Sequence, residues 1–189
     1  MKMIEGGVTA AQGFVAGGIH CGIRKNKSKP DLAMIYSETP CAAAAVYTQN
    51  LVKGAPILVT KKNIENGYAK AVICNSGNAN TCNADGVEKA EAMCDLTAKA
   101  LGIDPQDVVV ASTGVIGQVL PLEPIEAGIP ELVKVLSPKG SNGAATAIMT
   151  TDTIAKEAAA EVEIGGKTVR MGGISKGSGM IHPNMATKL

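Results

Sequence analysis

Short apolar runs bounded by glycine, proline and asparagine divide the first half of this 189-residue sequence into pieces too short for most helices. Apolar runs of this length between turn-forming residues are typical of β-strands. We therefore predict a strand in each of these runs, although the alanines of AAAAVYT also favour a helix. The runs are residues 18–23, 31–37, 42–48, 56–60 and 69–75.

The pattern changes in the middle of the chain. Within residues 84–101, apolar side chains recur every three or four positions, which places them on one face of a helix. Asp85 stands at the position of an N-cap, and Gly102 follows the last apolar residue, as at a helix C-terminus. An amphipathic helix is expected here. Residues 107–112 then predict a buried strand, and residues 123–136 predict a weaker helix interrupted by a glycine and a proline.

Near the end of the chain, residues 160–173 alternate apolar and polar side chains on both sides of Gly165 and Gly166. A two-glycine connection between alternating runs predicts a β-hairpin, because both turn positions require a positive φ. The sequence contains no repeat, low-complexity block or linker. The expected fold class is α/β, a mixed α+β arrangement, in a single domain over residues 1–189.

Composition and charge exclude several classes of protein. The formal net charge is +1 with the charges scattered, so we expect no nucleic-acid partner. No stretch approaches the ~20 apolar residues of a transmembrane helix, and we expect no membrane partner. The N-terminal MKMIEGGVTAAQGF contains an acid and no apolar core, unlike a secretory signal.

The cysteines are odd in number and form no C-x-x-C pair, which favours reduced, buried thiols of a cytosolic protein over disulfides or a metal site; they are residues 21, 41, 74, 82 and 94.

The apolar residues of this chain are mostly small. The sequence has no Trp and one Phe, against 22 glycines. Because small side chains fill a core only where backbones approach closely, we expect tight contacts between elements or a buried face completed by another chain.

Two glycine-bearing loops follow predicted strands, whereas the familiar phosphate, zinc-protease and nucleophile-elbow motifs are absent. NSGNANTCNADG (75–86) leads into the long helix, either as a tight structural connection or as a nest of backbone amides for an anion. STGVIG (112–117) follows an apolar strand. There a threonine hydroxyl and a glycine N–H can point at one spot, as an oxyanion hole requires, or the segment is an ordinary turn.

A third loop, KGSGMIHPNMAT (176–187), ends in a threonine. A threonine becomes a good nucleophile when it opens a chain, because its own α-amine, with a pKa of ~7.7–8.0, then serves as the base. Such a terminus is released when the hydroxyl attacks the preceding carbonyl and water opens the resulting ester. The glycines and proline of this stretch favour the strained bend that this reaction needs, although a frayed tail has a similar composition.

Four motifs together resemble the ArgJ family. NSGNAN (75–80), STGVIG (112–117), MTTDT (149–153) and KGSGMIHPNMAT (176–187) occur in the order and spacing of that family. The resemblance extends over the whole chain, from GGVTAAQGF onward. It implies layered sheets and helices like those of the self-cleaving N-terminal-nucleophile hydrolases, with a topology of the family's own.

The resemblance also implies roles for individual residues. In the ArgJ family a precursor cuts itself before a threonine into an α chain and a β chain that remain associated, and this chain resembles the α part. The cleaved bond would lie between Ala186 and Thr187, and Thr187 would be the nucleophile. The resemblance implies four further residues: an oxyanion-hole pair, Thr113 and Gly114, and two substrate contacts, Thr153 and Lys176.

The implied activity is that of a glutamate N-acetyltransferase of the cyclic arginine pathway. The threonine would take the acetyl group from N-acetylornithine, release ornithine and pass the acetyl group to glutamate, a ping-pong reaction. No metal or cofactor is expected, and acetyl-CoA would be a further substrate only of a bifunctional enzyme. The expected partner is the β chain of the same precursor, in an (αβ)2 heterotetramer in the cytoplasm, and activity is expected to require it.

Two other functions stay open from the sequence. One is an aminopeptidase or amidase of the same self-cleaving type, in which water replaces glutamate as the acceptor. The other is a non-catalytic α subunit, in which the glycine loops are only turns.

Overall fold

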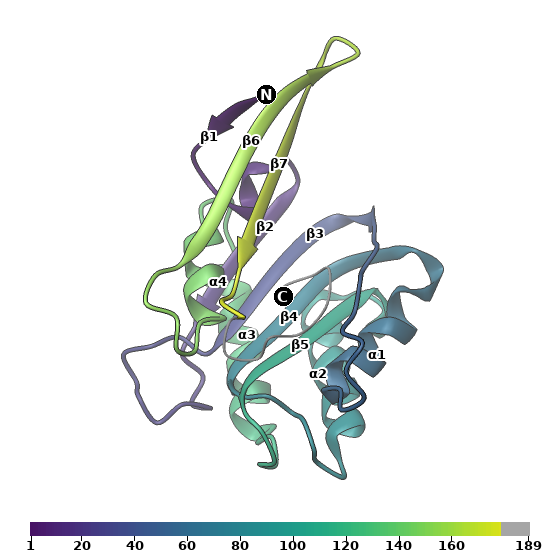
Figure 1. Cartoon of the computed structure of the whole chain (residues 1–189), viewed down its shortest axis with the longest axis vertical. Coiled ribbons are helices and arrows are strands. Elements are labelled where there is room, and N and C mark those ends of the chain that lie inside the picture. Colours follow the sequence, from purple (N-terminus) through teal and green to yellow (C-terminus); the bar gives the residue numbers. More distant parts are fainter. Residues whose placement is uncertain (179–189) are drawn as a thin grey trace.

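Two β-sheets organise the chain, whose computed structural model describes residues 1–178 (Figure 1). The larger sheet has the order β2-β3-β4-β5, with antiparallel neighbours except for the parallel pair β4-β5. The smaller sheet is antiparallel, in the order β1-β6-β7. The strands are β1 (Lys2–Ile4), β2 (Phe14–Ile19), β3 (Leu32–Ala42), β4 (Tyr68–Asn78), β5 (Val108–Val115), β6 (Lys156–Ile164) and β7 (Lys167–Ser175).

Helices cover both faces of the larger sheet. The principal core lies under α1, α2 and α3, where Leu32 and Met34 of β3 are fully buried. The intervening Ala33 points to the opposite face, in a smaller cluster with the alanines of α4. This alternation is what the two-residue period of a strand dictates. The helices are α1 (Ala55–Asn63), α2 (Gly86–Leu101), α3 (Glu123–Val135) and α4 (Ser141–Ala147), with short 3₁₀ turns at Val8–Ala10, Ile64–Asn66 and Pro105–Asp107.

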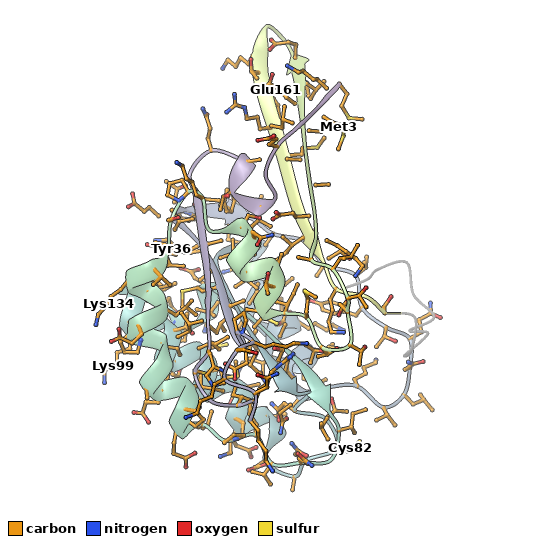
Figure 2. The ribbon with its side chains drawn as sticks, turned by 90° about the vertical axis from the view of Figure 1, so that its left-hand side faces the viewer. Met3, Tyr36, Cys82, Lys99, Lys134 and Glu161 are labelled. Carbon is orange, nitrogen blue, oxygen red and sulfur yellow. The ribbon has the colours of Figure 1, made fainter. Side chains whose placement is uncertain are left out.

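The predicted mixed α/β fold is confirmed, as are several of its elements. The run 69–75 lies in β4, and the runs 31–37 and 107–112 and the helix predicted at 84–101 coincide with β3, β5 and α2 except for one or two residues at their starts. Gly102 ends that helix with a left-handed backbone, although Asp85 makes no side-chain capping bond. The hairpin also forms, with Gly165 at φ 58° and Gly166 at φ 75°. It projects away from the larger sheet (Figure 1), and Figure 2 shows Glu161 on the hairpin and Met3 on the adjacent β1 at the end of the molecule opposite Cys82.

One predicted strand was wrong and two others need correction. Residues 56–60 belong to helix α1, because Pro56 suits a first helical turn and the buried side chains recur at helical spacing. The strand predicted at 18–23 is β2, which starts at Phe14 and ends at Ile19. Only Ala42 of the run 42–48 is in a strand, and the rest is neither strand nor helix.

Two helices differ from expectation, and both make close contacts. Helix α3 continues through Pro130. Its other expected interruption, Gly128, lies against Cys21, where an added Cβ would come within 2.5 Å of the cysteine Cβ. Helix α4, which the sequence patterns did not reveal, lies against β2 so closely that a Cβ at Gly18 would be 2.2 Å from the carbonyl oxygen of Gly143. These contacts agree with the close packing expected from the many small residues.

Side chains of helix α1 also form hydrogen bonds with the backbone groups at the outer edge of β5. The Thr60 hydroxyl donates to the Val110 carbonyl at 2.7 Å and accepts from the Val110 N–H at 3.0 Å. The Asn63 amide donates to the Val108 carbonyl at 2.9 Å. An edge strand whose polar groups are bonded in this way offers no template for another strand at these positions.

Two expectations from composition concern thiols and membranes. All of the cysteines are free, but only Cys94 is fully buried and Cys82 is exposed, so the expectation that all are buried was wrong. Within residues 1–178, no helix is both long and apolar enough to cross a bilayer.

Candidate active site

The carboxyl ends of β4 and β5 meet at a pair of glycines. In the parallel register of these strands, Ser76 lies opposite Thr113 and Gly77 opposite Gly114. Gly114 has φ +136°, and a Cβ there would lie 2.4 Å from the carbonyl carbon of Gly77. No larger residue fits at this position. The close contact fixes the backbone of Thr113 and Gly114 at this edge of the sheet, and the oxyanion hole expected from the STGVIG motif stays a prediction.

The asparagine-rich loop 75–86 stabilises the segment that follows β5. The Asn78 and Asn83 amides donate to the Gln118 carbonyl at 2.9 and 2.7 Å, and Asn80 donates to the Gly86 carbonyl at 2.8 Å. Asn78 and Asn80 are buried. The backbone N–H groups of Ala79 and Asn80 are also bonded, to the Val115 carbonyl at 2.9 Å and to Asn78 Oδ1 at 2.7 Å, so the geometry supports a structural connection, the first of the two interpretations of this loop.

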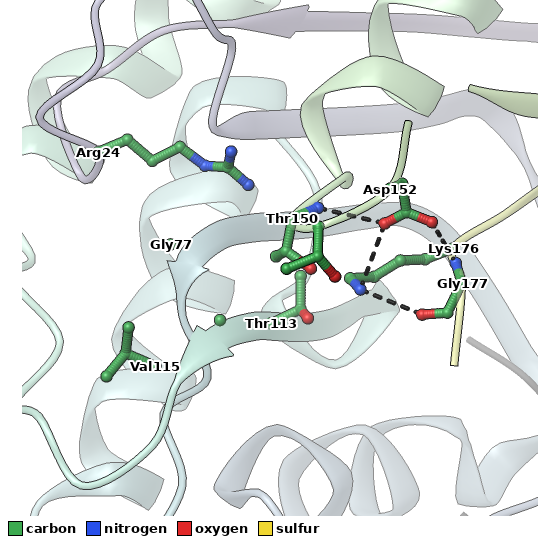
Figure 3. Close-up of a pocket in the computed structure, with 10 residues that line it drawn as sticks. Arg24, Gly77, Thr113, Val115, Thr150, Asp152, Lys176 and Gly177 are labelled. Atoms are coloured by element: carbon green, nitrogen blue, oxygen red, sulfur yellow. Dashed lines mark hydrogen bonds and ion pairs between the residues drawn. The ribbon is translucent and has the colours of Figure 1, made fainter. Parts of the chain in front are cut away.

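A cavity of about 610 Å³ opens beside the glycine pair (Figure 3). Its size is within the range of small-molecule sites. The walls come from five separate parts of the chain: the turn after β2, the end of β4, the end of β5, the segment after α4, and the segment after β7. The lining residues are Arg24, Gly77, Thr113, Gly114, Val115, Thr150, Thr151, Asp152, Lys176 and Gly177.

Asp152 holds two walls of this cavity together (Figure 3). Its carboxylate accepts hydrogen bonds from the Gly177 N–H at 2.6 Å, the Thr150 N–H at 3.2 Å and the Lys156 ammonium at 2.9 Å. The Lys176 ammonium lies 3.4 Å from Oδ2, the oxygen that also accepts from Thr150, and the Asp152 side chain is only 3% exposed. Burial alone raises the pKa of this carboxyl, but the bonds from Lys156, Gly177 and Thr150 and the charge of Lys176 outweigh it. They hold the pKa well below its ordinary range.

Arg24 reaches the cavity from a turn fixed by a buried acid. The fully buried Asp31 accepts from the N–H groups of Cys21 and Arg24, at 2.7 and 2.8 Å. The Arg24 stem then crosses Gly77, where a Cβ would be 2.9 Å from its Cγ. Its guanidinium donates from Nη2 to the Met149 carbonyl. The turn, the glycine and the carbonyl thus determine where the guanidinium lies.

No cysteine thiolate is available beside this cavity as a rival nucleophile within residues 1–178. Burial raises the pKa of the Cys74 thiol on β4 to about 12, although the charge of Lys176 acts to lower it. It is therefore a thiol at neutral pH, and a thiol is a poor nucleophile. No group of acidic, histidine and cysteine side chains suited to a metal ion occurs in the same part of the chain.

The structure brings together three of the predicted site residues and adds others. Thr113, Gly114 and Lys176 line the cavity, whereas Thr153 is exposed and does not. The two preceding threonines of MTTDT, Thr150 and Thr151, line it instead. Ala186 and Thr187 lie outside the described residues. The sequence reasoning missed Arg24 and Asp152; the second stands inside a motif that was singled out, but nothing local marks the first.

Comparisons with known proteins identify relatives of this chain. Residues 15–189 match the sequence model of the ArgJ family. The arginine biosynthesis bifunctional protein ArgJ of Symbiobacterium thermophilum is 54% identical over 191 residues, an alignment that covers 100% of this chain and 48% of the relative. The protein of the same name from Bacillus subtilis is 52% identical over 188 residues, covering 98% of this chain and 45% of the relative. The chain therefore spans about half the length of the curated relatives it matches.

Solved structures share the fold. The crystal structure of the arginine biosynthesis bifunctional protein ArgJ from Bacillus halodurans superposes with a TM-score of 0.91 at 43% identity and covers 97% of both chains. The structure of an ornithine acetyltransferase from Mycobacterium tuberculosis, complexed with ornithine, gives a TM-score of 0.88 at 36% identity, covering 98% of this chain and 99% of that one. The expected family and fold are confirmed: this chain belongs to the ArgJ family.

Proposed function

We propose that this chain is the α part of a glutamate N-acetyltransferase, which moves an acetyl group from N-acetylornithine to glutamate. The observation that carries the proposal is the close pairing of Gly77 with Gly114, which places Thr113 and Gly114 at the wall of a cavity that also contains Lys176. A hydroxyl and a backbone N–H at fixed positions are suited to stabilise a developing oxyanion. Relatives named for arginine biosynthesis and for ornithine acetyl transfer support the choice of substrates.

The chemistry begins after the chain is cut between Ala186 and Thr187. The new α-amine of Thr187 takes the proton of its own hydroxyl, whose oxygen attacks the acetyl carbonyl of N-acetylornithine. Thr113 and Gly114 donate hydrogen bonds to the resulting oxyanion. The C–N bond then breaks, and the proton passes from the α-amine to the departing ornithine nitrogen. An acetyl ester remains on the threonine.

The second half of the reaction reverses these steps with glutamate. The neutral amine of glutamate attacks the ester, the same two donors stabilise the oxyanion, and the threonine oxygen leaves with a proton returned through the α-amine. The acetyl group never leaves the enzyme except on an amino acid, so the proposal requires no metal or cofactor. Acetyl-CoA is the further acetyl donor to test, since the relatives are called bifunctional.

The proposed partner is the remaining half of the family's chain. The alignments cover only 48% and 45% of the two relatives. A β chain that begins at the cleaved threonine would supply the nucleophile and the substrate contacts that this half lacks. We place the two chains in an (αβ)2 heterotetramer in the cytoplasm, which mass measurement and fractionation will test.

The decisive experiment is Thr113→Ala in the two-chain protein. Loss of one oxyanion donor typically costs about 10²–10³ in kcat, and we expect that loss in acetyl transfer from N-acetylornithine to glutamate. Thr168→Ala, on the projecting hairpin, is the matched control and should keep full activity. Equal rates in the two variants would remove Thr113 from the mechanism. Release of free acetate without acetylglutamate would favour the hydrolase alternative.

A further inference from the structure

The charges that line the cavity are unequally compensated. Asp152 supplies the carboxylate that lines the cavity, and this group already binds Lys156, Lys176 and two backbone N–H groups. The Lys176 ammonium also donates to the Gly177 carbonyl at 3.1 Å. The positive charge of Lys176 is therefore already balanced by Asp152. The guanidinium of Arg24, by contrast, pairs with no carboxylate anywhere in residues 1–178.

The donors of Arg24 are also incompletely used. One bond from Nη2 reaches the Met149 carbonyl, and the buried Nε has no hydrogen-bond partner within residues 1–178. A guanidinium carries five N–H donors in a planar fork that matches the two oxygens of a carboxylate. A buried donor without a partner costs free energy, so a site that keeps one is suited to a ligand that supplies the acceptor.

The position of this guanidinium is fixed before a ligand arrives. The Arg24 N–H is bonded to the buried Asp31, the stem lies across Gly77, and one nitrogen is held by Met149. In Figure 3 the guanidinium points from one side of the cavity toward the side where Thr150 and Asp152 lie. An arginine held in this way loses little further side-chain entropy when it binds an anion.

We infer that Arg24 binds a carboxylate of the amino-acid substrate and makes the enzyme select free acids over amides. The inference rests on the proposed function, which supplies the substrates. N-acetylornithine and glutamate both carry an α-carboxylate, and glutamate carries a second on its side chain. The chemistry recognised is the same in each case, and the substrates chosen below separate the two sources.

The test compares Arg24→Gln with wild type in the two-chain protein, using kcat/KM for matched acids and amides. N-acetylornithine is compared with its α-amide as donor, and glutamate with glutamine and with isoglutamine as acceptors. We expect Arg24→Gln to lower kcat/KM for the acids by about 10- to 100-fold and to leave the amide of the recognised carboxylate nearly unchanged. Loss of discrimination against both α-amides assigns the α-carboxylate, and loss against glutamine alone assigns the side chain.

The controls separate binding from a structural effect. Arg170→Gln changes the sequence's other arginine, which pairs with Glu161 at 2.8 Å on the hairpin, and should behave as wild type. Arg24→Lys keeps a charge without the fork and should lower the acid-to-amide ratio by about 3- to 10-fold. This variant decides the question if Arg24→Gln does not fold, because an unchanged ratio overturns the inference. A fall of equal size for acids and amides in Arg24→Gln overturns it as well, since that result indicates support of the Met149 segment alone.

The same experiment distinguishes this inference from the proposed function. Wild-type protein that transfers acetyl groups while Arg24→Gln keeps its discrimination overturns the role of Arg24 only. Wild-type protein that acetylates no amino acid overturns the proposed function. Calorimetric binding of ornithine and its α-amide, which carry no acetyl group to transfer, to wild type and Arg24→Gln then measures the acid preference without chemistry, and an equal preference in the two proteins overturns the inference.

Discussion

Replacing Asp152 with asparagine tests how the two walls of the cavity are held together. The substitution keeps the shape of the side chain but removes its charge and turns one acceptor oxygen into an NH₂ donor. At present Oδ1 accepts from Gly177 and Lys156, and Oδ2 accepts from Thr150 and faces Lys176. Whichever way the amide is oriented, its NH₂ meets donors instead of acceptors. Two of these four contacts must therefore be lost.

The expected cost follows from the burial of each partner. The Asp152 side chain is 3% exposed and Lys176 16% exposed, so the backbone bonds and this ion pair are weakly screened. Lys156 is 42% exposed, and its pair contributes little, at most about 1 kcal/mol. Hydrogen bonds to a charged group contribute about 1.5–3 kcal/mol each, and the asparagine keeps part of them. We expect Asp152→Asn to lower the free energy of unfolding by about 2–4 kcal/mol, or the Tm by about 5–15 °C.

The same reasoning predicts how the difference varies with pH. The folded-state pKa of Asp152 is held below its ordinary value of 3.8, so the folded protein binds the proton less readily than the unfolded chain does. The stabilisation from this carboxylate is therefore complete above about pH 4 to 5 and is lost as the pH falls through the folded-state pKa. The gap in Tm between wild type and Asp152→Asn should be constant near neutrality and should narrow below about pH 4.

Thermal denaturation followed by circular dichroism from pH 3 to 8 measures both effects. Asp85→Asn is the matched control, because Asp85 is 42% exposed and lies 4.0 Å from Lys89; it should shift the free energy of unfolding by about 0.5 kcal/mol or less. If Asp152→Asn melts no lower than this control at pH 7, the carboxylate does not hold the two segments together. A gap that stays constant down to pH 3 would refute the account of its pKa.

Two further substitutions test the strand ends that carry the site. Gly114→Ala places a Cβ 2.4 Å from the Gly77 carbonyl carbon and should lower kcat by about 10²–10³, whereas Gly67→Ala, also at positive φ but with nothing within 4 Å, should cost only about 1 kcal/mol of stability and leave kcat unchanged. Similar kcat values for the two variants would contradict the importance of the glycine pair. Thr60→Val removes both hydrogen bonds to Val110 and should lower the free energy of unfolding by about 1–3 kcal/mol in urea denaturation, while Thr60→Ser keeps the hydroxyl and should recover most of it. Equal losses in the valine and serine variants would mean that packing, not the hydroxyl, is responsible.

Local patterns predicted the elements whose formation depends mainly on neighbouring residues. In helix α2 the apolar residues recur at helical spacing on one face, and the hairpin has two glycines where its turn requires positive φ. That Thr113 and Gly114 lie together near the end of β5 was predictable for a similar reason, since a strand and its terminal Thr-Gly are contiguous in the sequence; their role as an oxyanion hole stays a prediction. Helix α1 shows the limit of this reasoning. PILVT has the composition of a strand, but Pro56 in the first turn and the bonds of Thr60 to β5 favour the helix.

The residues missed at the site depend on contacts between distant parts of the chain. Arg24 meets Met149 across 125 positions, and Asp152 meets Gly177 across 25. Neither contact leaves a periodic pattern, because a single arginine in a turn and a single acid after a helix have the same local sequence whether or not they serve a site. Their roles become visible only when the elements are in place.

The small residues of this sequence explain how those distant segments meet. Helix α4 approaches β2 at Gly18 and Gly143 to a distance that a single added methyl group would prevent. The helix ends at Ala147, whose carbonyl accepts a hydrogen bond from Ser76 of β4 at 2.5 Å. Two residues later, the Met149 carbonyl accepts from Arg24, and further along Asp152 accepts from the Gly177 N–H, just beyond the end of β7. The scarcity of large side chains is thus a requirement of the site, because only close backbone packing brings the arginine, the acid and the paired strand ends to one cavity.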